Sequence, residues 1–174
     1  MTELTIRQAA PHEAGEVSAI LRDAEAWLEG EGMPMWLPEE LREDRLRHDV
    51  EAGMHYLAIV GGELAGTLRF QLEDEEYWPD LPAADSAFVH RLAVRRRFAG
   101  TGVGAALLDW AAERARTLGR QLLRLDCDWH RPRLRAFYER NGFVHHSDRQ
   151  VGPFFVARYE RRTRVSSRSP SSSW

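Results

Sequence analysis

An apolar run, a glycine-rich turn and a helix-like run follow one another without interruption between residues 86 and 117. SAFVHRLAV (86–94) has the apolar content of a buried strand, and apolar residues recur at three- and four-residue steps over roughly 103–117. The next run, QLLRLDCD (121–128), again has the pattern of a strand. This order predicts a β-α-β crossover with parallel strand pairing, and therefore an α/β fold.

The rest of the chain predicts additional strands and helices. Two apolar runs joined at Gly61-Gly62 indicate an antiparallel hairpin, so the sheet should be mixed. Other expected elements are a strand at 4–9, helices at 12–30, 38–53 and 131–142, and a final pair of strands over 143–161. We expect one domain over residues 1–162, with a mixed α/β (α+β) sheet of six to seven strands and helices on both faces. Residues 163–174 are rich in serine and arginine, and we expect them to be disordered.

Composition argues against several classes of protein. The net charge of −3 argues against a nucleic-acid-binding domain. No segment approaches the roughly 18 to 20 apolar residues of a membrane span, and the first residues lack the layout of a secretion signal. Cys127 is the single cysteine, so we expect neither an internal disulfide nor a zinc cluster. The sequence predicts a cytoplasmic protein without a membrane or nucleic-acid partner.

The turn GTGVG (100–104) has the composition of a phosphate-binding loop. The first amides of a helix have no partner within it, and glycine allows a phosphate to approach them closely. The alternative is that these glycines form a tight turn that binds no ligand. A Walker A loop requires lysine, which the chain lacks, and the dinucleotide fingerprint fails because its third glycine falls at Ala105 or Leu107.

RFAGTG (97–102) resembles the R/Q-x-x-G-x-G/A signature of the GNAT superfamily of acyl-CoA-dependent N-acyltransferases. FYERNGF (137–143) is similar to a second segment of that family, and the resemblance covers 86–143 closely and the remainder in element order. It implies the GNAT fold, with the fourth and fifth strands splayed apart, and acetyl-CoA as co-substrate without a metal. It also implies acetyl transfer to a primary amine by direct attack through a tetrahedral intermediate.

The resemblance assigns the cofactor-binding residues. Main-chain groups of Leu92, Ala93 and Val94 would contact the pantetheine arm and the thioester carbonyl, and an amide near Leu92 would stabilise the oxyanion. Arg131 stands where many relatives carry asparagine; because its guanidinium only donates hydrogen bonds, that contact is weakened or replaced. The pyrophosphate would be bound by the signature segment, which comprises Arg97, Phe98, Ala99, Gly100, Thr101, Gly102, Val103 and Gly104.

The catalytic candidates are a general acid and a general base. Tyr138 aligns with the family's tyrosine acid, and a phenol keeps its proton at neutral pH until a thiolate takes it. From the residues alone, we would interpret Tyr138 as part of the core stripe of its helix, together with Leu134 and Phe137. The base could be His90, Asp126 or a chain of waters. Cys127 has no basic partner that would activate it, so we interpret it as a core cysteine and not as a nucleophile.

An acidic segment from Glu73 to Asp85, together with Tyr77, Trp78 and the loop 33–36, suggests a small, cationic, partly apolar amine as acceptor. A solvated loop without such a role is the alternative. Two other functions are compatible with the sequence: a non-catalytic acyl-CoA-binding module, and a protein or peptide N-acetyltransferase. The sequence leaves open the acceptor's identity, the acyl-chain preference and the oligomeric state, with a homodimer among the alternatives.

Overall fold

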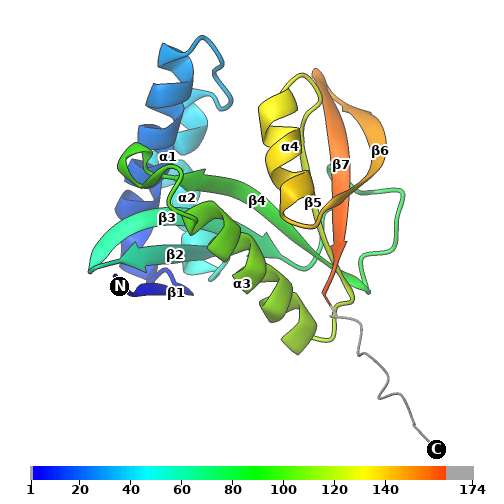
Figure 1. Ribbon diagram of the computed structural model, residues 1–174, viewed down its shortest axis with the longest axis horizontal. Coiled ribbons are helices and arrows are strands. Elements are labelled where there is room, and N and C mark those ends of the chain that lie inside the picture. Colours follow the sequence, from blue (N-terminus) through cyan, green and yellow to red (C-terminus); the bar gives the residue numbers. More distant parts are fainter. Residues whose placement is uncertain (1, 164–174) are drawn as a thin grey trace, which may run out of the picture.

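The computed structural model describes residues 2–163, and a seven-stranded sheet in the order β1-β2-β3-β4-β5-β7-β6 forms its centre (Figure 1). The strands are β1 (Leu4–Gln8), β2 (His55–Val60), β3 (Glu63–Gln71), β4 (Ser86–Val94), β5 (Leu122–Asp128), β6 (Val144–Val151) and β7 (Phe154–Arg162). The α-helices are α1 (Ala14–Gly30), α2 (Glu43–Glu51), α3 (Val103–Thr117) and α4 (Pro132–Arg140). Three short 3-10 helices are η1 (Pro11–Glu13), η2 (Pro38–Leu41) and η3 (Arg96–Phe98).

The predicted α/β architecture is confirmed. β4 and β5 pair in parallel, and the other neighbouring strands pair antiparallel. Successive residues of a strand point to opposite faces, and each face buries its own apolar cluster. On β2, Leu57 packs with α1 and α2, whereas Ala58 packs with α3 on the other face. The expected helices on both faces of a mixed sheet are therefore present.

Two helix boundaries differ from the sequence-based expectation. The helix expected from residue 12 begins at Ala14, because the preceding Pro11–Glu13 segment forms a 3-10 turn. The helix expected over 38–53 divides into η2 and α2. Arg42 between them has an extended backbone, with φ −66° and ψ 144°, and this conformation interrupts the helical hydrogen bonds.

The end of the chain is described only up to Thr163. Its hydroxyl donates to the carbonyl of Arg120 at 2.7 Å, and its side chain is buried. The rest of the predicted disordered segment, 164–174, lies outside the described residues. Within residues 2–163, every helix is too short or too polar to cross a membrane.

The two parallel strands separate along their length, as the splay prediction requires (Figure 1). β4 pairs with β5 only from Ser86 to Phe88, and from Val89 onward it has no partner on that side within the described residues. On its other side β4 remains paired to β3, but with a bulge: Arg69 pairs with His90 and Thr67 pairs with Ala93. Arg91, in the bulge, has a φ of +52°. The separation leaves the ends of β4 and β5 free to form the walls of a site.

Candidate active site

A cleft of about 420 Å³ opens where β4 and β5 diverge. Its walls come from the ends of these strands, from α4, from the loop between α1 and η2, and from the loop before β4. Polar and titratable groups from several elements meet in it. The titratable side chains that line it include those of Glu76, Tyr77, His90, Asp126, Cys127, Asp128, Arg131 and Tyr138.

The glycine turn presents several free amides. Phe98, Ala99 and Thr101 donate their backbone N–H groups within the turn itself, to the carbonyls of Arg95, Arg96 and Phe98. Five amides of the turn and the start of α3 have no backbone acceptor among the described residues: those of Gly100, Gly102, Val103, Gly104 and Ala105. Unpaired amides at a helix start, together with the helix dipole, form a site suited to an anion.

Glycine is required in this turn by the backbone conformation. Gly100 and Gly102 have φ of +75° and +89°, a region that residues with a Cβ rarely adopt. A Cβ on either residue would meet nothing within 4 Å, so the space in front of the turn is open. Gly104 differs, because a Cβ there would lie 3.1 Å from the ring of Phe137. Gly104 therefore lets α3 and α4 pack closely, in addition to offering its amide.

Two of the three arginines before the turn are already engaged by the protein. Arg96 stacks over the ring of Trp27 at 4.2 Å, and Arg97 forms an ion pair with Glu63. Arg97, which we assigned to the pyrophosphate, is exposed. To bind a phosphate through its side chain, the Arg97 guanidinium would have to leave Glu63 or contact Glu63 and the phosphate at the same time.

Leu92, Ala93 and Val94 form the end of β4 beyond the bulge. Thr67 and Gly66 of β3 pair with Ala93 and Val94, while the side facing β5 has no strand partner in the described chain. Leu92 also lines the cleft. Main-chain groups of this segment are thus located between the glycine turn and the titratable residues of the cleft.

Tyr138 on α4 is buried, with 6% of the residue exposed, and its ring packs against Phe143 and Tyr159. Its hydroxyl makes no hydrogen bond with any described residue, and the side chain lines the cleft. Burial raises the pKa of the phenol well above its usual range, with smaller contributions from Cys127 and Asp126. The two interpretations of Tyr138 are compatible, because a core ring can carry a protonated hydroxyl to the cleft.

His90 and Asp126 are brought together by adjacent strands. His90 Nδ1 lies 4.0 Å from Asp126 Oδ2, and both side chains are largely buried. Burial raises the pKa of the Asp126 carboxyl to about 6, against the opposing effect of His90. Asp126 Oδ2 is buried and has no hydrogen-bond partner among the described residues.

Asp74 is a member of this cluster that sequence reasoning did not select. Its Oδ2 lies 2.7 Å from His90 Nε2. Ligand atoms of Asp74, His90 and Asp126 all lie within 4.8 Å of one another, a spacing that would also suit a metal ion. The expectation that the protein uses no metal stays a prediction.

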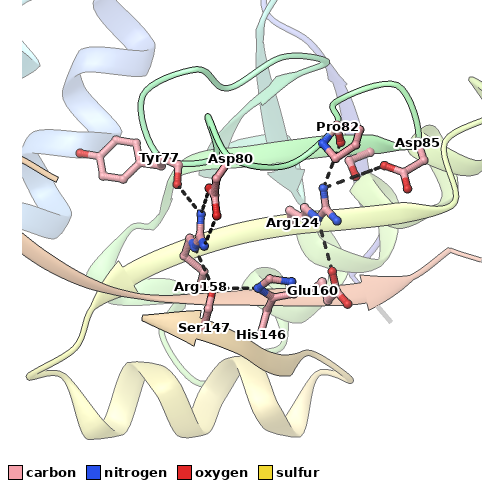
Figure 2. A network of polar contacts seen from close by, with 10 residues as sticks. Tyr77, Asp80, Pro82, Asp85, Arg124, His146, Ser147, Arg158 and Glu160 are labelled. Atoms are coloured by element: carbon pink, nitrogen blue, oxygen red, sulfur yellow. Dashed lines mark hydrogen bonds and ion pairs between the residues drawn. The ribbon is translucent and has the colours of Figure 1, made fainter. Parts of the chain in front are cut away.

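The acidic loop between β3 and β4 is anchored by two arginines of the sheet (Figure 2). Arg158 of β7 donates to both carboxylate oxygens of Asp80, at 2.6 and 3.0 Å. Arg124 of β5 donates to the carbonyl of Pro82 at 3.2 Å and to Glu160 at 3.3 Å. Both guanidinium groups thus hold the loop against β5 and β7.

Trp78 belongs to this anchor and not to the acceptor surface. The guanidinium carbons of Arg124 and Arg158 lie 5.1 and 4.6 Å from its ring centroid, and the residue is 2% exposed. Glu76 and Tyr77, next to it, do line the cleft. The acidic segment therefore has two parts: some residues fix the loop and others face the cleft.

Arg131 contacts the loop on the acceptor side. Its guanidinium donates to the carbonyl oxygens of Met33 and Pro34, at 3.0 and 2.5 Å. The same loop is also held by Glu25, whose carboxylate accepts hydrogen bonds from the backbone amides of Met35 and Trp36. Arg131 lines the cleft, and the contacts it makes in this structure are with the protein. Its assignment to the cofactor stays a prediction.

Replacing Cys127 by alanine should leave turnover within about threefold of wild type, because we interpret the thiol as a core group and not as a nucleophile. Burial raises the pKa of this thiol to about 12, so it stays protonated and unreactive at neutral pH. The measurement is thiol release from acetyl-CoA in the presence of an amine. A loss of activity above about a hundredfold, with an acetylated Cys127 in the wild type by mass spectrometry, would instead indicate a covalent intermediate.

The divergent strands, the free amides beside them and the buried tyrosine in the cleft are the features that the resemblance to acyl-CoA-dependent acyltransferases led us to expect. The sequence model of the acetyltransferase (GNAT) family matches residues 19–143. The uncharacterized N-acetyltransferase YesJ of Bacillus subtilis (strain 168) is 31% identical over 143 residues, which are 78% of this chain and 78% of that protein. The chain belongs to the GNAT acetyltransferase family and is an acyltransferase.

Solved structures share the fold at low sequence identity. The PaiA N-acetyltransferase from Thermoplasma acidophilum, in complex with coenzyme A, has a TM-score of 0.72 and 18% identity, over 92% of this chain and 99% of that one. The aminoglycoside acetyltransferase AAC(6')-Ib, in complex with coenzyme A and kanamycin, has a TM-score of 0.74 and 14% identity, over 92% and 95%. Both similarities support the fold assignment.

Proposed function

We propose that this protein transfers the acetyl group of acetyl-CoA to the primary amine of a small molecule by direct attack. The observation that carries the proposal is that one cleft, beside the free amides of the glycine turn, contains both a protonated phenol and a His–Asp pair. An acetyl transfer of this kind needs an anion site for the co-substrate, a proton acceptor for the amine and a proton donor for the departing sulfur.

We assign each of these tasks to residues of the cleft and the glycine turn. The amides of Gly100, Gly102, Val103 and Gly104 would bind the pyrophosphate of the co-substrate. Main-chain groups near Leu92 would bind the thioester carbonyl and stabilise its oxyanion. The base would come from the pair His90 and Asp126, and the raised pKa of Tyr138 keeps its proton available for the thiolate.

The acceptor we propose is a cationic amine. Glu76, Asp126 and Asp128 place carboxylates in the cleft, and Trp36 and Tyr77 add aromatic surface beside them. Carboxylates attract an ammonium, and aromatic faces favour a cation. The aminoglycoside acetyltransferase AAC(6')-Ib, whose fold is similar, offers a parallel, since its structure holds kanamycin together with coenzyme A.

The experiment that tests this function is thiol release from acetyl-CoA with a panel of small amines and a panel of peptides. We expect turnover with at least one small cationic amine. Turnover confined to peptides would move the assignment to a peptide N-acetyltransferase. Binding of coenzyme A without turnover on either panel would indicate a non-catalytic acyl-CoA-binding module.

Activity should fall as the pH drops through about 6, because the Asp126 carboxyl takes up a proton there. Since burial raises this pKa, Asp126 is ionised above about pH 6 and neutral below it. Asp126→Asn should change the position of this acidic limb in the kcat/KM profile and lower the rate at pH 8 by about tenfold. Asp128→Asn is the matched control, on the same strand, and should keep the limb. If the acidic limb is the same in Asp126→Asn and in the wild type, a group other than Asp126 titrates. The pH profile of His90→Ala, measured in the same way, tests the other candidate base.

A further inference from the structure

The contact between Asp74 and His90 is short and shielded from solvent. Asp74 Oδ2 lies 2.7 Å from His90 Nε2, and 3% of the Asp74 side chain and 12% of the His90 side chain are exposed. Burial opposes ionisation of Asp74, but the hydrogen bond and charge of His90 and the backbone amide of Tyr77 hold its pKa below the usual range. An ionised carboxylate only accepts hydrogen bonds, so the hydrogen of this contact belongs to His90 Nε2.

Asp74 is itself fixed in place. Its second oxygen, Oδ1, accepts the backbone amide of Tyr77 at 2.9 Å. The carbonyl of Tyr77 accepts from Arg158 at 3.1 Å, and Arg158 also holds Asp80, as Figure 2 shows. The anchor of the acidic loop thus extends to the carboxylate that contacts His90.

We propose that Asp74 is a positioning residue for acetyl transfer, holding His90 with its hydrogen on Nε2 so that Nδ1 accepts the proton of the amine. This inference rests on the proposed function. Neutral imidazole has one donor and one acceptor nitrogen, so a hydrogen fixed on Nε2 leaves the lone pair on Nδ1. Nδ1 is the nitrogen that faces Asp126, and both residues line the cleft.

The charges around His90 favour this role. Asp74 from the loop and Asp126 from β5 face its two nitrogens, at 2.7 and 4.0 Å. Arg69 is its pairing partner on β3, and the ring of Tyr77 lies 5.7 Å away between centroids. Arg69 is neutralised by Asp49 at 2.9 Å, so an imidazolium formed at His90 would lie between two carboxylates.

The proton balance of the step is complete. The ammonium gives one proton to His90 Nδ1, and the freed lone pair forms the N–C bond. As the C–S bond breaks, the sulfur takes the phenol proton of Tyr138. The nitrogen loses its second proton, and this proton converts the Tyr138 phenolate back to the phenol. His90 then releases its proton to solvent, so each turnover of an ammonium yields an amide, a thiol and one proton.

Asp74→Asn tests the proposal, with Glu75→Gln as a control that removes the same charge from an adjacent, exposed position. We expect Asp74→Asn to lower kcat by about 100-fold or more, with little change in the KM for acetyl-CoA. Glu75→Gln should stay close to wild type. A kcat within about fivefold of wild type in Asp74→Asn would overturn the proposal.

Nitrogen-15 NMR of the imidazoles provides a readout that a merely structural role would not move. His90 is assigned by the signals missing from His90→Ala. Wild-type His90 should show the Nε2–H tautomer, and Asp74→Asn should lose this preference. An Nδ1–H tautomer in the wild type overturns the proposal even if Asp74→Asn does not fold. Absence of amine acetylation would defeat the proposed function instead, and the tautomer would still report whether Asp74 controls His90.

Discussion

Tyr138→Phe should lower kcat by about 10² to 10³-fold while leaving coenzyme A affinity unchanged. The substitution removes only the hydroxyl, and the ring remains packed against Phe143 and Tyr159. Without the phenol, the sulfur must leave as a thiolate or take a proton from water. Steady-state thiol release gives kcat, and calorimetric titration with coenzyme A gives the affinity.

Tyr159→Phe is the matched control for this experiment. Its hydroxyl donates to Glu139 and accepts from Arg135, so it is used within the fold and does not line the cleft. Its removal should cost about 1 kcal/mol of unfolding free energy and leave kcat within about threefold. If Tyr138→Phe has the activity of the wild type, Tyr138 is a core residue and the proton comes from elsewhere.

Gly102→Val should weaken coenzyme A binding by about 100-fold or more, a loss of roughly 3 kcal/mol of binding free energy. Gly102 has a φ of +89°, where a β-branched residue is strained, and a valine would project into the open space before the turn. The change would therefore both distort the amides and obstruct the phosphate. Calorimetric titration measures the affinity, and thermal unfolding measures the cost to the fold.

Gly119→Val separates these two effects. Gly119 follows the other end of α3, has a φ of +75°, and a Cβ there also meets nothing within 4 Å. We expect a similar loss of stability, on the order of 1–2 kcal/mol, with unchanged coenzyme A affinity. Equal coenzyme A affinity in Gly102→Val and wild type would eliminate the glycine turn as the binding site.

Local patterns in the sequence were sufficient to predict most of the fold. The glycine pair 61–62, the period of the helix over 103–117 and the strand runs on either side of it each depend on neighbouring residues, and all three predictions are confirmed. The splay of β4 from β5 followed from family resemblance and is also present. The break at Arg42 was not predicted, because an extended residue between two helical turns leaves no periodic signal.

The site was predictable only where a motif defined it. Asp74 is one of several acids in its loop, and its contact with His90 depends on Arg158, a residue 84 positions later in the chain. Arg131 could be aligned with a family position, but the direction of its side chain is set by the carbonyls of Met33 and Pro34. Both cases depend on contacts between distant segments, for which spacing in the sequence provides no signal.

Isothermal titration of coenzyme A into the folded wild-type chain decides whether the free amides from Gly100 to Gly104 bind the co-substrate. We predict a heat signal that fits one site per chain and disappears in Gly102→Val. Circular dichroism of the same sample confirms that the chain is folded. No heat from a folded wild-type sample, across temperatures that vary the binding enthalpy, would contradict the proposed acetyl-CoA site and the chemistry built on it.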